Sequence, residues 1–299
     1  MKKLFAAVAI CALLFVPGQV RFAEAVPVRV VSPGTGVFLG NVVVARGNVT
    51  ERSSNGTDIR VRSAGTTLFY SPEASLLFGL SIPYVDKKRS TDGMGEASVS
   101  GLGDVSAIGH WRFFNRMGRG YRDMAALRLV LELPTGETNR AVDLPLPEPA
   151  RRALQPGSGA LDTTLLLALG RAHYRYAAFA NLSWRHNGEF KDLRGGDVAA
   201  FDLHGGAFLF PKRTRSLGFE VYAGLETRFE HRERTRFQGA DLANSGGEVL
   251  TASPFLQLIL GARALLETSI QFPVIDDTNG TQPDLDYSVL FGFRLIPGT

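Results

Sequence analysis

Hydrophobic and polar residues alternate one by one along most of this chain. Residues 219–230 show the pattern well, because the odd positions are mostly apolar and the even positions mostly polar or charged. The first set is Phe219, Val221, Ala223, Leu225, Thr227 and Phe229, and the second is Glu220, Tyr222, Gly224, Glu226, Arg228 and Glu230. Neighbouring side chains of a β-strand point to opposite faces, whereas a helix would mix the two sets. The pattern therefore predicts a strand with one apolar and one polar face.

The same alternation recurs along the chain and predicts about twelve strands. Their expected ranges are 37–47, 57–70, 74–86, 102–114, 123–134, 162–173, 175–187, 197–210, 217–231, 248–260, 263–275 and 285–296. The first strand has the weakest signal, because Val42, Val43 and Val44 do not alternate with polar residues. Without it the number of strands would be odd, which bacterial membrane barrels avoid.

The links between these strands are alternately short and long. The short links are 71–73, 175, 211–216 and 261–262, with a moderate one at 115–122; the long links are 48–56, 87–101, 135–161, 188–196, 232–247 and 276–284. Outer-membrane barrels join their strands by short periplasmic turns and long extracellular loops. A soluble β-sandwich has no reason to segregate its loops by length. We therefore predict an all-β fold, a transmembrane antiparallel up-and-down β-barrel, and keep a secreted sandwich as the alternative.

Aromatic residues on the apolar faces gather near the ends of the predicted strands. They are Phe69, Tyr84, Trp111, Phe113, Tyr176, Trp184, Phe219, Phe229, Phe272, Tyr287 and Phe293. Amphipathic rings favour the level of the lipid headgroups, so membrane barrels carry two aromatic girdles. We expect these rings to face lipid rather than to pack a soluble core.

The first 25 residues have the order of a secretory signal peptide. Lys2 and Lys3 precede the apolar run from Leu4 to Val16, and Ala23-Glu24-Ala25 is a small-x-small cleavage site. We therefore predict that residues 1–25 are removed and that residues 26–299 form the barrel. The apolar run is shorter than the ~20 residues of a membrane-spanning helix, and no later run approaches that length.

Composition excludes several classes of protein. The chain is 44% hydrophobic and 10% aromatic, which is too much for a disordered protein. Its single cysteine, Cys11, lies in the predicted signal peptide, so neither a disulfide framework nor a cysteine-based zinc site is expected. A net charge of +4 over 299 residues is too small for a dedicated nucleic-acid-binding protein.

The polar faces of the strands carry many charged residues, which we expect to line the barrel interior. Facing lipid near the midplane, an Arg or Lys would cost about 2–4 kcal/mol. The predicted pore-lining residues are Asp104, His110, Arg112, Arg128, Glu132, Arg185, Asp202, His204, Glu220, Glu226, Arg228, Glu267 and Arg294, and Arg171 is assigned to the same face. Their mixed signs fit either a salt-bridge network that fills the interior or a polar conduit whose charges tune selectivity.

Few other residues suggest chemistry. His186, beside Trp184 and followed by Asn187, could belong to a hydrolase acting at the lipid boundary, but no serine shares its face. A rim metal site at His186 and His231 and a calcium site among Asp276, Asp277, Asp284 and Asp286 are weaker options than solvated side chains. The loop 143–157 holds four prolines and could fold inward as a constriction. We predict no catalytic residues, no metal and no cofactor.

A series of motifs in a fixed order resembles a known family. The motifs are Ala74-Ser75-Leu76-Leu77-Phe78-Gly79-Leu80-Ser81-Ile82-Pro83-Tyr84, Gly101-Leu102-Gly103-Asp104-Val105-Ser106, Leu133-Pro134-Thr135-Gly136 and Gly157-Ser158-Gly159. Over residues 57–296 the chain is similar to the MetA-pathway of phenol degradation family. The resemblance implies an outer-membrane transporter loosely linked to aromatic compounds, with no catalytic residues to carry over. One departure is the end of the chain, which runs from Phe293 to Thr299 and does not finish on an aromatic residue.

Together these observations predict a channel of the cell outer membrane for diffusion of small solutes, aromatic or hydrophobic ones among them, and not an enzyme. The expected partners are outer-membrane lipids, lipopolysaccharide and the solute itself. Nucleic acid is not an expected partner, and the sequence leaves the oligomeric state open. Loops 87–101 and 135–161 are expected to set selectivity. A lipid-modifying hydrolase and a plugged structural or surface-binding barrel remain the alternatives.

Overall fold

The computed structural model describes residues 28–29, 40–54, 56–93, 95–140, 146–210, 218–261 and 264–295. The predicted signal peptide and the final residues 296–299 lie outside these ranges. Among the described residues, no helix has the length and apolar character that a membrane crossing requires.

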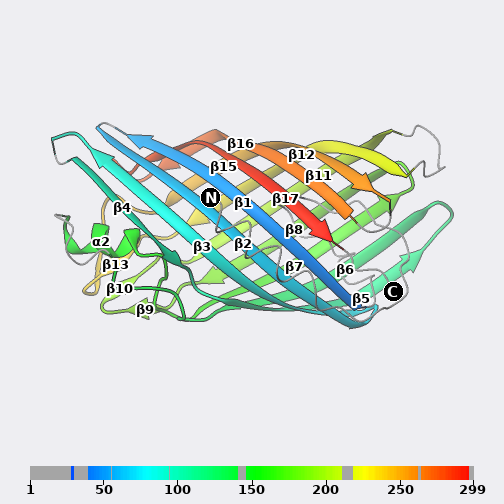
Figure 1. Cartoon of the computed structure of the whole chain (residues 1–299), viewed down its shortest axis with the longest axis horizontal. Helices are drawn as coiled ribbons and strands as arrows, with labels where there is room; N and C mark the ends of the chain where they lie inside the picture. The colour runs from blue at the N-terminus through cyan, green and yellow to red at the C-terminus, as the bar shows by residue number, and fades with distance from the viewer. Residues whose placement is uncertain are drawn as a thin grey trace.

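Twelve antiparallel strands of the described chain close into a barrel (Figure 1), as the alternation predicts. They are β1 (Gly40–Ser54), β2 (Thr57–Glu73), β3 (Leu76–Thr91), β5 (Ser106–Met117), β6 (Tyr121–Glu132), β7 (Asp162–His173), β8 (Tyr176–His186), β11 (Val198–Phe210), β12 (Phe219–Arg232), β15 (Gly247–Leu260), β16 (Ala264–Thr278) and β17 (Asp284–Leu295). Each pairs with its neighbour in sequence, and β17 pairs with β1 to close the ring. Closure leaves no sheet edge exposed, which lipid requires.

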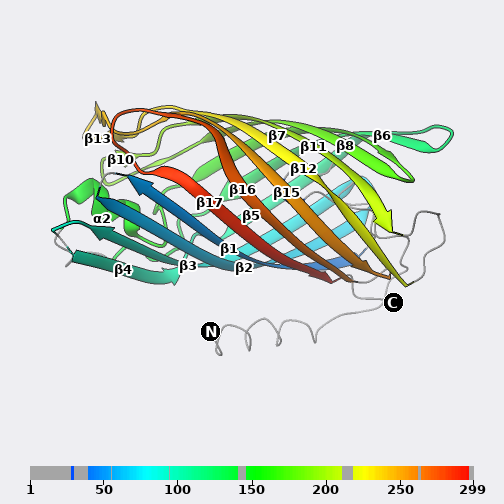
Figure 2. The same cartoon turned by 90° about the horizontal axis from the view of Figure 1, so that it is seen from above.

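Short elements gather at the end of the barrel that bears the longer loops (Figure 2). They are β4 (Gly95–Leu102), α2 (Glu148–Leu154), β9 (Glu189–Phe190), β10 (Leu193–Arg194), β13 (Arg236–Phe237) and β14 (Ala240–Asp241). Short turns join the strands at the opposite end, which is therefore periplasmic. The loop-bearing end is extracellular.

Two of the predicted long loops are strand instead. β1 and β2 stay paired out to Ser54 and Thr57, so most of the predicted link at 48–56 is strand. β3 and β4 form a hairpin that extends beyond the ring and covers most of 87–101. Strands outside the membrane have no lipid-facing side, so they are held by cross-strand pairs such as Lys88 with Glu96 rather than by apolar alternation.

The outer surface of the barrel is apolar, as a lipid-facing surface must be. Ten of the eleven predicted girdle aromatics are exposed on it: Tyr84, Trp111, Phe113, Tyr176, Trp184, Phe219, Phe229, Phe272, Tyr287 and Phe293. Phe69 was predicted wrongly. It packs inward against Gly79 of β3, where an added Cβ would lie only 2.6 Å from the ring, and its neighbour Tyr70 faces outward.

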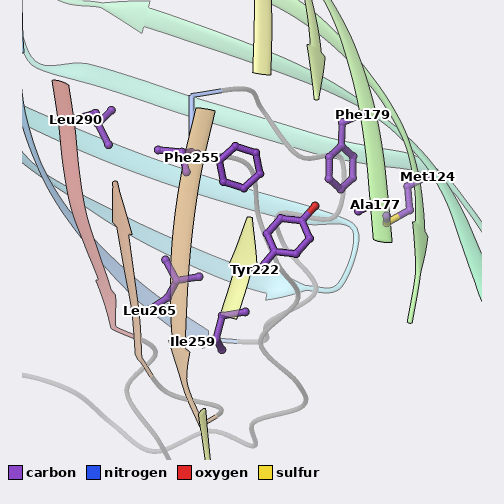
Figure 3. Packing of buried hydrophobic residues seen from close by; sticks show 9 residues of the cluster. Met124, Ala177, Phe179, Tyr222, Phe255, Ile259, Leu265 and Leu290 are labelled. Atoms are coloured by element: carbon purple, nitrogen blue, oxygen red, sulfur yellow. The ribbon is translucent and has the colours of Figure 1, made fainter. Parts of the chain in front are cut away.

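The barrel interior holds many buried polar residues and one apolar cluster. Figure 3 shows the side chains of the cluster. The cluster consists of Val28, Met124, Ala177, Phe179, Tyr222, Phe255, Ile259, Leu265 and Leu290. Its strand residues lie within about five positions of the periplasmic ends of their strands, so the cluster narrows that half of the barrel. Aromatic rings lie at the centre of this cluster, where the ring centroids of Tyr222 and Phe255 are 5.6 Å apart.

Two adjacent glycines of β11 test how tightly this cluster is packed. A Cβ on inward-facing Gly206 would lie 2.4 Å from Oη of the fully buried Tyr222, whereas one on outward-facing Gly205 would meet nothing within 4 Å. We expect Gly206→Ala to lower the free energy of unfolding by about 1–3 kcal/mol, a typical cost of overpacking. Gly205→Ala should leave it unchanged or slightly raised. Urea unfolding in lipid vesicles measures both, and equal losses would contradict the packing described here.

Candidate functional site

All thirteen predicted pore-lining residues lie on the interior side of the wall, by strand parity or by burial. The most buried are Asp104, His110, Arg112, Asp202, His204, Glu226 and Glu267. That they line a solute path stays a prediction. Arg171 differs, because it lies on the outer face at the periplasmic end of β7, where its side chain is 59% exposed and pairs with Asp123 at 2.6 Å. A charge at this level meets headgroups and water and costs little.

Glu267 of β16 is the centre of the first interior ion cluster. Its carboxylate accepts hydrogen bonds from Arg46 Nε at 2.9 Å and Arg294 Nη2 at 2.7 Å. Gln257 Nε2 donates to the same carboxylate at 3.2 Å. Gly292 leaves the space that the Glu267 side chain fills. Sequence reasoning missed Arg46, because the apolar triplet before it hides the alternation of β1.

Opposite charges also pair across the strands nearer the extracellular end. Asp202 of β11 directly opposes Arg228 of β12 and accepts its hydrogen bond at 2.9 Å. Arg228 also donates to Glu230, at 3.1 Å. On the adjoining strands β8, β7 and β6, Arg185 donates to Glu132 at 3.2 Å and to Asp162 at 2.7 Å. These pairs satisfy the buried charges.

Glu226 joins the polar network to the apolar cluster at mid-height. His204 Nδ1 lies 3.2 Å from Glu226 Oε1, and His204 Nε2 lies 2.9 Å from the Tyr222 hydroxyl. The imidazole also stacks on Phe255, with ring centroids 4.8 Å apart. Each buried polar atom of this set thus has a partner, as a low-dielectric environment requires.

Two residues that precede the first strand lie inside the barrel. The backbone N–H of Val28 donates to Glu226 Oε1 at 2.8 Å, and that of Arg29 donates to Glu226 Oε2 at 3.0 Å. The Arg29 side chain donates to Ser269 Oγ at 2.8 Å and to the Ser288 carbonyl at 2.9 Å. Val28 is 1% exposed. Val28 and Arg29 therefore occupy part of the lumen, a feature that no sequence pattern indicated.

Asp104 brings three of the family-like motifs together at the extracellular end. Its carboxylate accepts hydrogen bonds from the backbone N–H groups of Gly136, at 2.7 Å, and Ser158. Gly136 and Gly157 touch backbone to backbone, since a Cβ on Gly136 would lie 2.7 Å from Gly157 Cα. Asp104 thus fixes the long loop to the barrel, and its carboxylate is directed at loop amides.

The long loop covers the extracellular mouth. Leu154 of α2 packs on Ala97 and Val99 of β4. The ammonium of Lys87, an inward-facing residue of β3, donates to the carbonyl oxygens of Ala153 at 3.0 Å and Gln155 at 2.6 Å. Within the described part of the proline-rich loop, residues 146–157 therefore fold over the mouth; residues 143–145 lie outside the described ranges.

Beneath this cover is a cavity of about 730 Å³, which we call the vestibule. Six basic and three acidic side chains line it: Lys87, Arg151, Arg152, Arg185, Lys191, Arg232, Glu132, Glu148 and Asp162. Lys87 lies three residues beyond the lipid-facing Tyr84 and contacts loop atoms, so it is outside the membrane-spanning part. Burial lowers the pKa of Lys87 to about 8, which leaves the amine mostly protonated at pH 7.

His186 lies on the outer face at the extracellular end of β8. Its Nδ1 is 2.9 Å from Asp197, and its ring stacks on Trp184 with centroids 5.6 Å apart. Partial burial alone would raise the pKa of Asp197, but hydrogen bonds from His186, the Asn187 amide and Arg194 outweigh it and hold this pKa below its usual value. No hydroxyl side chain of the described residues is hydrogen-bonded to His186, and no group of three potential metal ligands gathers in the described ranges.

Two solved structures resemble this fold over most of their length. An outer-membrane channel from Pseudomonas putida F1 is 14% identical in sequence, with a TM-score of 0.67 over 89% of this chain and 99% of that chain. The β domain of the Bordetella autotransporter BrkA is 15% identical, with a TM-score of 0.51 over 86% of this chain and 99% of that one. No family model and no curated protein matches the chain, so membership of the MetA-pathway family stays a prediction.

The chain is an outer-membrane β-barrel. Closure of the ring, the apolar outer surface with its aromatic residues, and the shared fold all agree on this architecture and location. At 14% and 15% sequence identity, the similarity to these two structures concerns the fold and does not identify a solute.

Proposed function

We propose that this barrel is a channel through which small solutes diffuse across the outer membrane. The observation that carries the proposal is the vestibule, which opens onto the inward-facing ends of the barrel strands. Glu132, Asp162 and Arg185 line it, and all three are interior residues of β6, β7 and β8. A solute in the vestibule therefore contacts the inner side of the barrel wall, away from lipid. The fold shared with the Pseudomonas putida channel supports this function.

The mechanism is passive. A solute enters between α2 and the loop 187–197, passes the paired charges of the upper lumen, and meets the N-terminal residues Val28 and Arg29 at mid-height. These two residues occupy lumen space at that level, which favours passage of small solutes. The apolar cluster in the periplasmic half offers contacts to an aromatic or hydrophobic body, in line with the substrates that the family resemblance implies.

Reconstitution tests this proposal. The full chain in planar bilayers should give discrete conductance steps in potassium chloride, and liposomes that contain it should swell in small solutes faster than in large ones. A barrel that gives neither current nor swelling would contradict a channel and favour the plugged structural barrel.

The second candidate, a lipid hydrolase, has one observation in its favour. His186 faces the extracellular membrane boundary with Asp197 as its orienting carboxylate, which is two thirds of a catalytic triad. The nucleophile is the missing part, since no hydroxyl of the described residues bonds to the imidazole. Lipid turnover by the purified protein that disappears in His186→Ala would establish this function instead.

A further inference from the structure

The vestibule has the chemistry of a binding site for organic anions. Its floor is made by inward-facing strand residues, among them Arg185 and Val198, and its cover by α2 and the loop 187–196. Lipid headgroups surround the barrel on the outside, so this cavity is reached along the barrel axis. The volume, about 730 Å³, lies in the ordinary range for small-molecule sites.

The acidic residues of the vestibule are already used by basic partners. Glu148 pairs with both Arg151 and Arg152. Glu132 and Asp162 both pair with Arg185. Arg232 pairs with Glu230 at 2.7 Å, so Lys87 and Lys191 are the lining cations without an ion pair among the described residues. They belong to the wall of a partly enclosed space, where positive charge attracts anions.

Lys87 is the basic group whose surroundings most favour an anion. Its ammonium has three N–H donors, and the two hydrogen bonds it makes both go to neutral carbonyl oxygens. Within the described ranges it forms no salt bridge. The two carboxylates whose charge acts on it are Asp104, which is bound to the amides of Gly136 and Ser158, and Glu132, which is bound to Arg185. A partly buried ammonium gains stability when a ligand supplies the opposite charge.

The remaining lining is apolar and suits an organic body. Phe190, Leu193, Pro156 and Val198 face the same cavity as Lys87. The Phe190 ring, with Lys191 Nζ 5.0 Å from its centroid, offers an apolar contact in the cavity that also holds the Lys87 ammonium. Inorganic anions would leave this apolar surface unused.

We propose that the vestibule binds small organic carboxylates with an apolar or aromatic body, and that Lys87 is the residue that binds the carboxylate. This inference rests on the proposed channel function and names the class of solute that the entrance selects.

Benzoate, its neutral analogue benzamide and inorganic phosphate are the probes, titrated by calorimetry into the full chain in detergent. Benzoate should bind, and Lys87→Met should weaken it about tenfold or more, as expected for the loss of one charged hydrogen bond. Lys87→Arg keeps the charge and should retain most of the affinity. Lys88→Met is the matched control, because Lys88 is the next residue of β3, faces outward and pairs with Glu96. Heat-modifiable migration on gels checks that each variant is folded.

Four results would overturn the inference: no binding of benzoate, equal benzoate affinity in Lys87→Met and the wild type, benzamide binding as tightly as benzoate, or phosphate binding more tightly than benzoate. The conductance measurement separates this failure from failure of the channel function. If the protein conducts current but does not bind benzoate, the proposed channel function stands and the proposed binding site is refuted. If it binds benzoate but conducts no current, the proposed binding site stands and the proposed channel function is refuted.

Discussion

Deletion of residues 26–31 should raise the single-channel conductance several-fold. Val28 and Arg29 lie in the lumen and are held by two backbone hydrogen bonds to Glu226 and by side-chain hydrogen bonds to β16 and β17. Ions must pass the space that these residues now fill. Removing Val28 and Arg29 frees lumen space beside Glu226, and conductance rises with the open cross-section. Planar-bilayer recordings of the deletion and the wild type give the comparison.

Two point variants make this test independent of the deletion. Arg29→Ala removes the side-chain anchors, and Glu226→Gln weakens the acceptor of both backbone N–H groups. Each should increase the frequency or size of open events, whereas outward-facing Lys88→Gln should not. Conductance that stays the same in the deletion and in both point variants would show that the N-terminal residues do not limit the path.

Replacement of Glu267 by alanine should be the most destabilising single substitution among the interior charges. The side chains of Arg46 and Arg294 both rely on this carboxylate, and Arg294 is only 12% exposed. Breaking a buried ion pair by removing one partner leaves an uncompensated charge and typically costs about 3–5 kcal/mol. Urea unfolding of the barrel from lipid vesicles measures the loss.

The exposed pair of Lys88 and Glu96 provides the control for this prediction. Its side chains are 40% and 54% exposed, so Glu96→Ala should cost less than about 1 kcal/mol. The double variant Glu267→Ala with Arg46→Met should be more stable than Glu267→Ala alone, because it removes one of the two arginines that lose their Glu267 partner. A loss in Glu267→Ala as small as that in Glu96→Ala would mean that water reaches and solvates the cluster.

The fold follows closely from the sequence because lipid outside and polar groups inside impose a strict period of two. Where the alternation is ambiguous, it predicts the wrong face of the strand for single side chains. Phe69 and Tyr70 are adjacent aromatics that fit either parity, and only the space above Gly79 directs Phe69 inward. Arg171 continues the parity of the lipid-facing Leu169 at a strand end, where the headgroup region removes the penalty that would have marked it.

The extracellular part was less predictable for a different reason. Both faces of a hairpin outside the membrane, such as β3–β4, are free of lipid, so apolar and polar residues need not alternate. Residues 87–101 therefore resembled a loop in the sequence. The covering position of residues 146–157 depends on long-range contacts, namely Asp104 with Gly136 and Lys87 with Gln155. Such contacts join positions far apart in the chain and leave no local pattern.

The lumen occupants were the least predictable feature. Val28 and Arg29 follow the predicted cleavage site by only a few residues and precede the first strand, so no periodicity applies to them. Their partners come from three strands at the other end of the chain, β12, β16 and β17. Only Glu226, Ser269 and Ser288 as a set explain why this segment lies inside.

The position of Arg29 also guides how the protein should be labelled. A purification tag or fluorophore joined directly after Ala25 would start beside residues that sit in the lumen, and its bulk would compete with the contacts to Glu226. β1 and β2 form a regular hairpin whose last described pair, Ser54 with Thr57, lies at its extracellular end. An epitope inserted there reports surface display and leaves the conduit untouched.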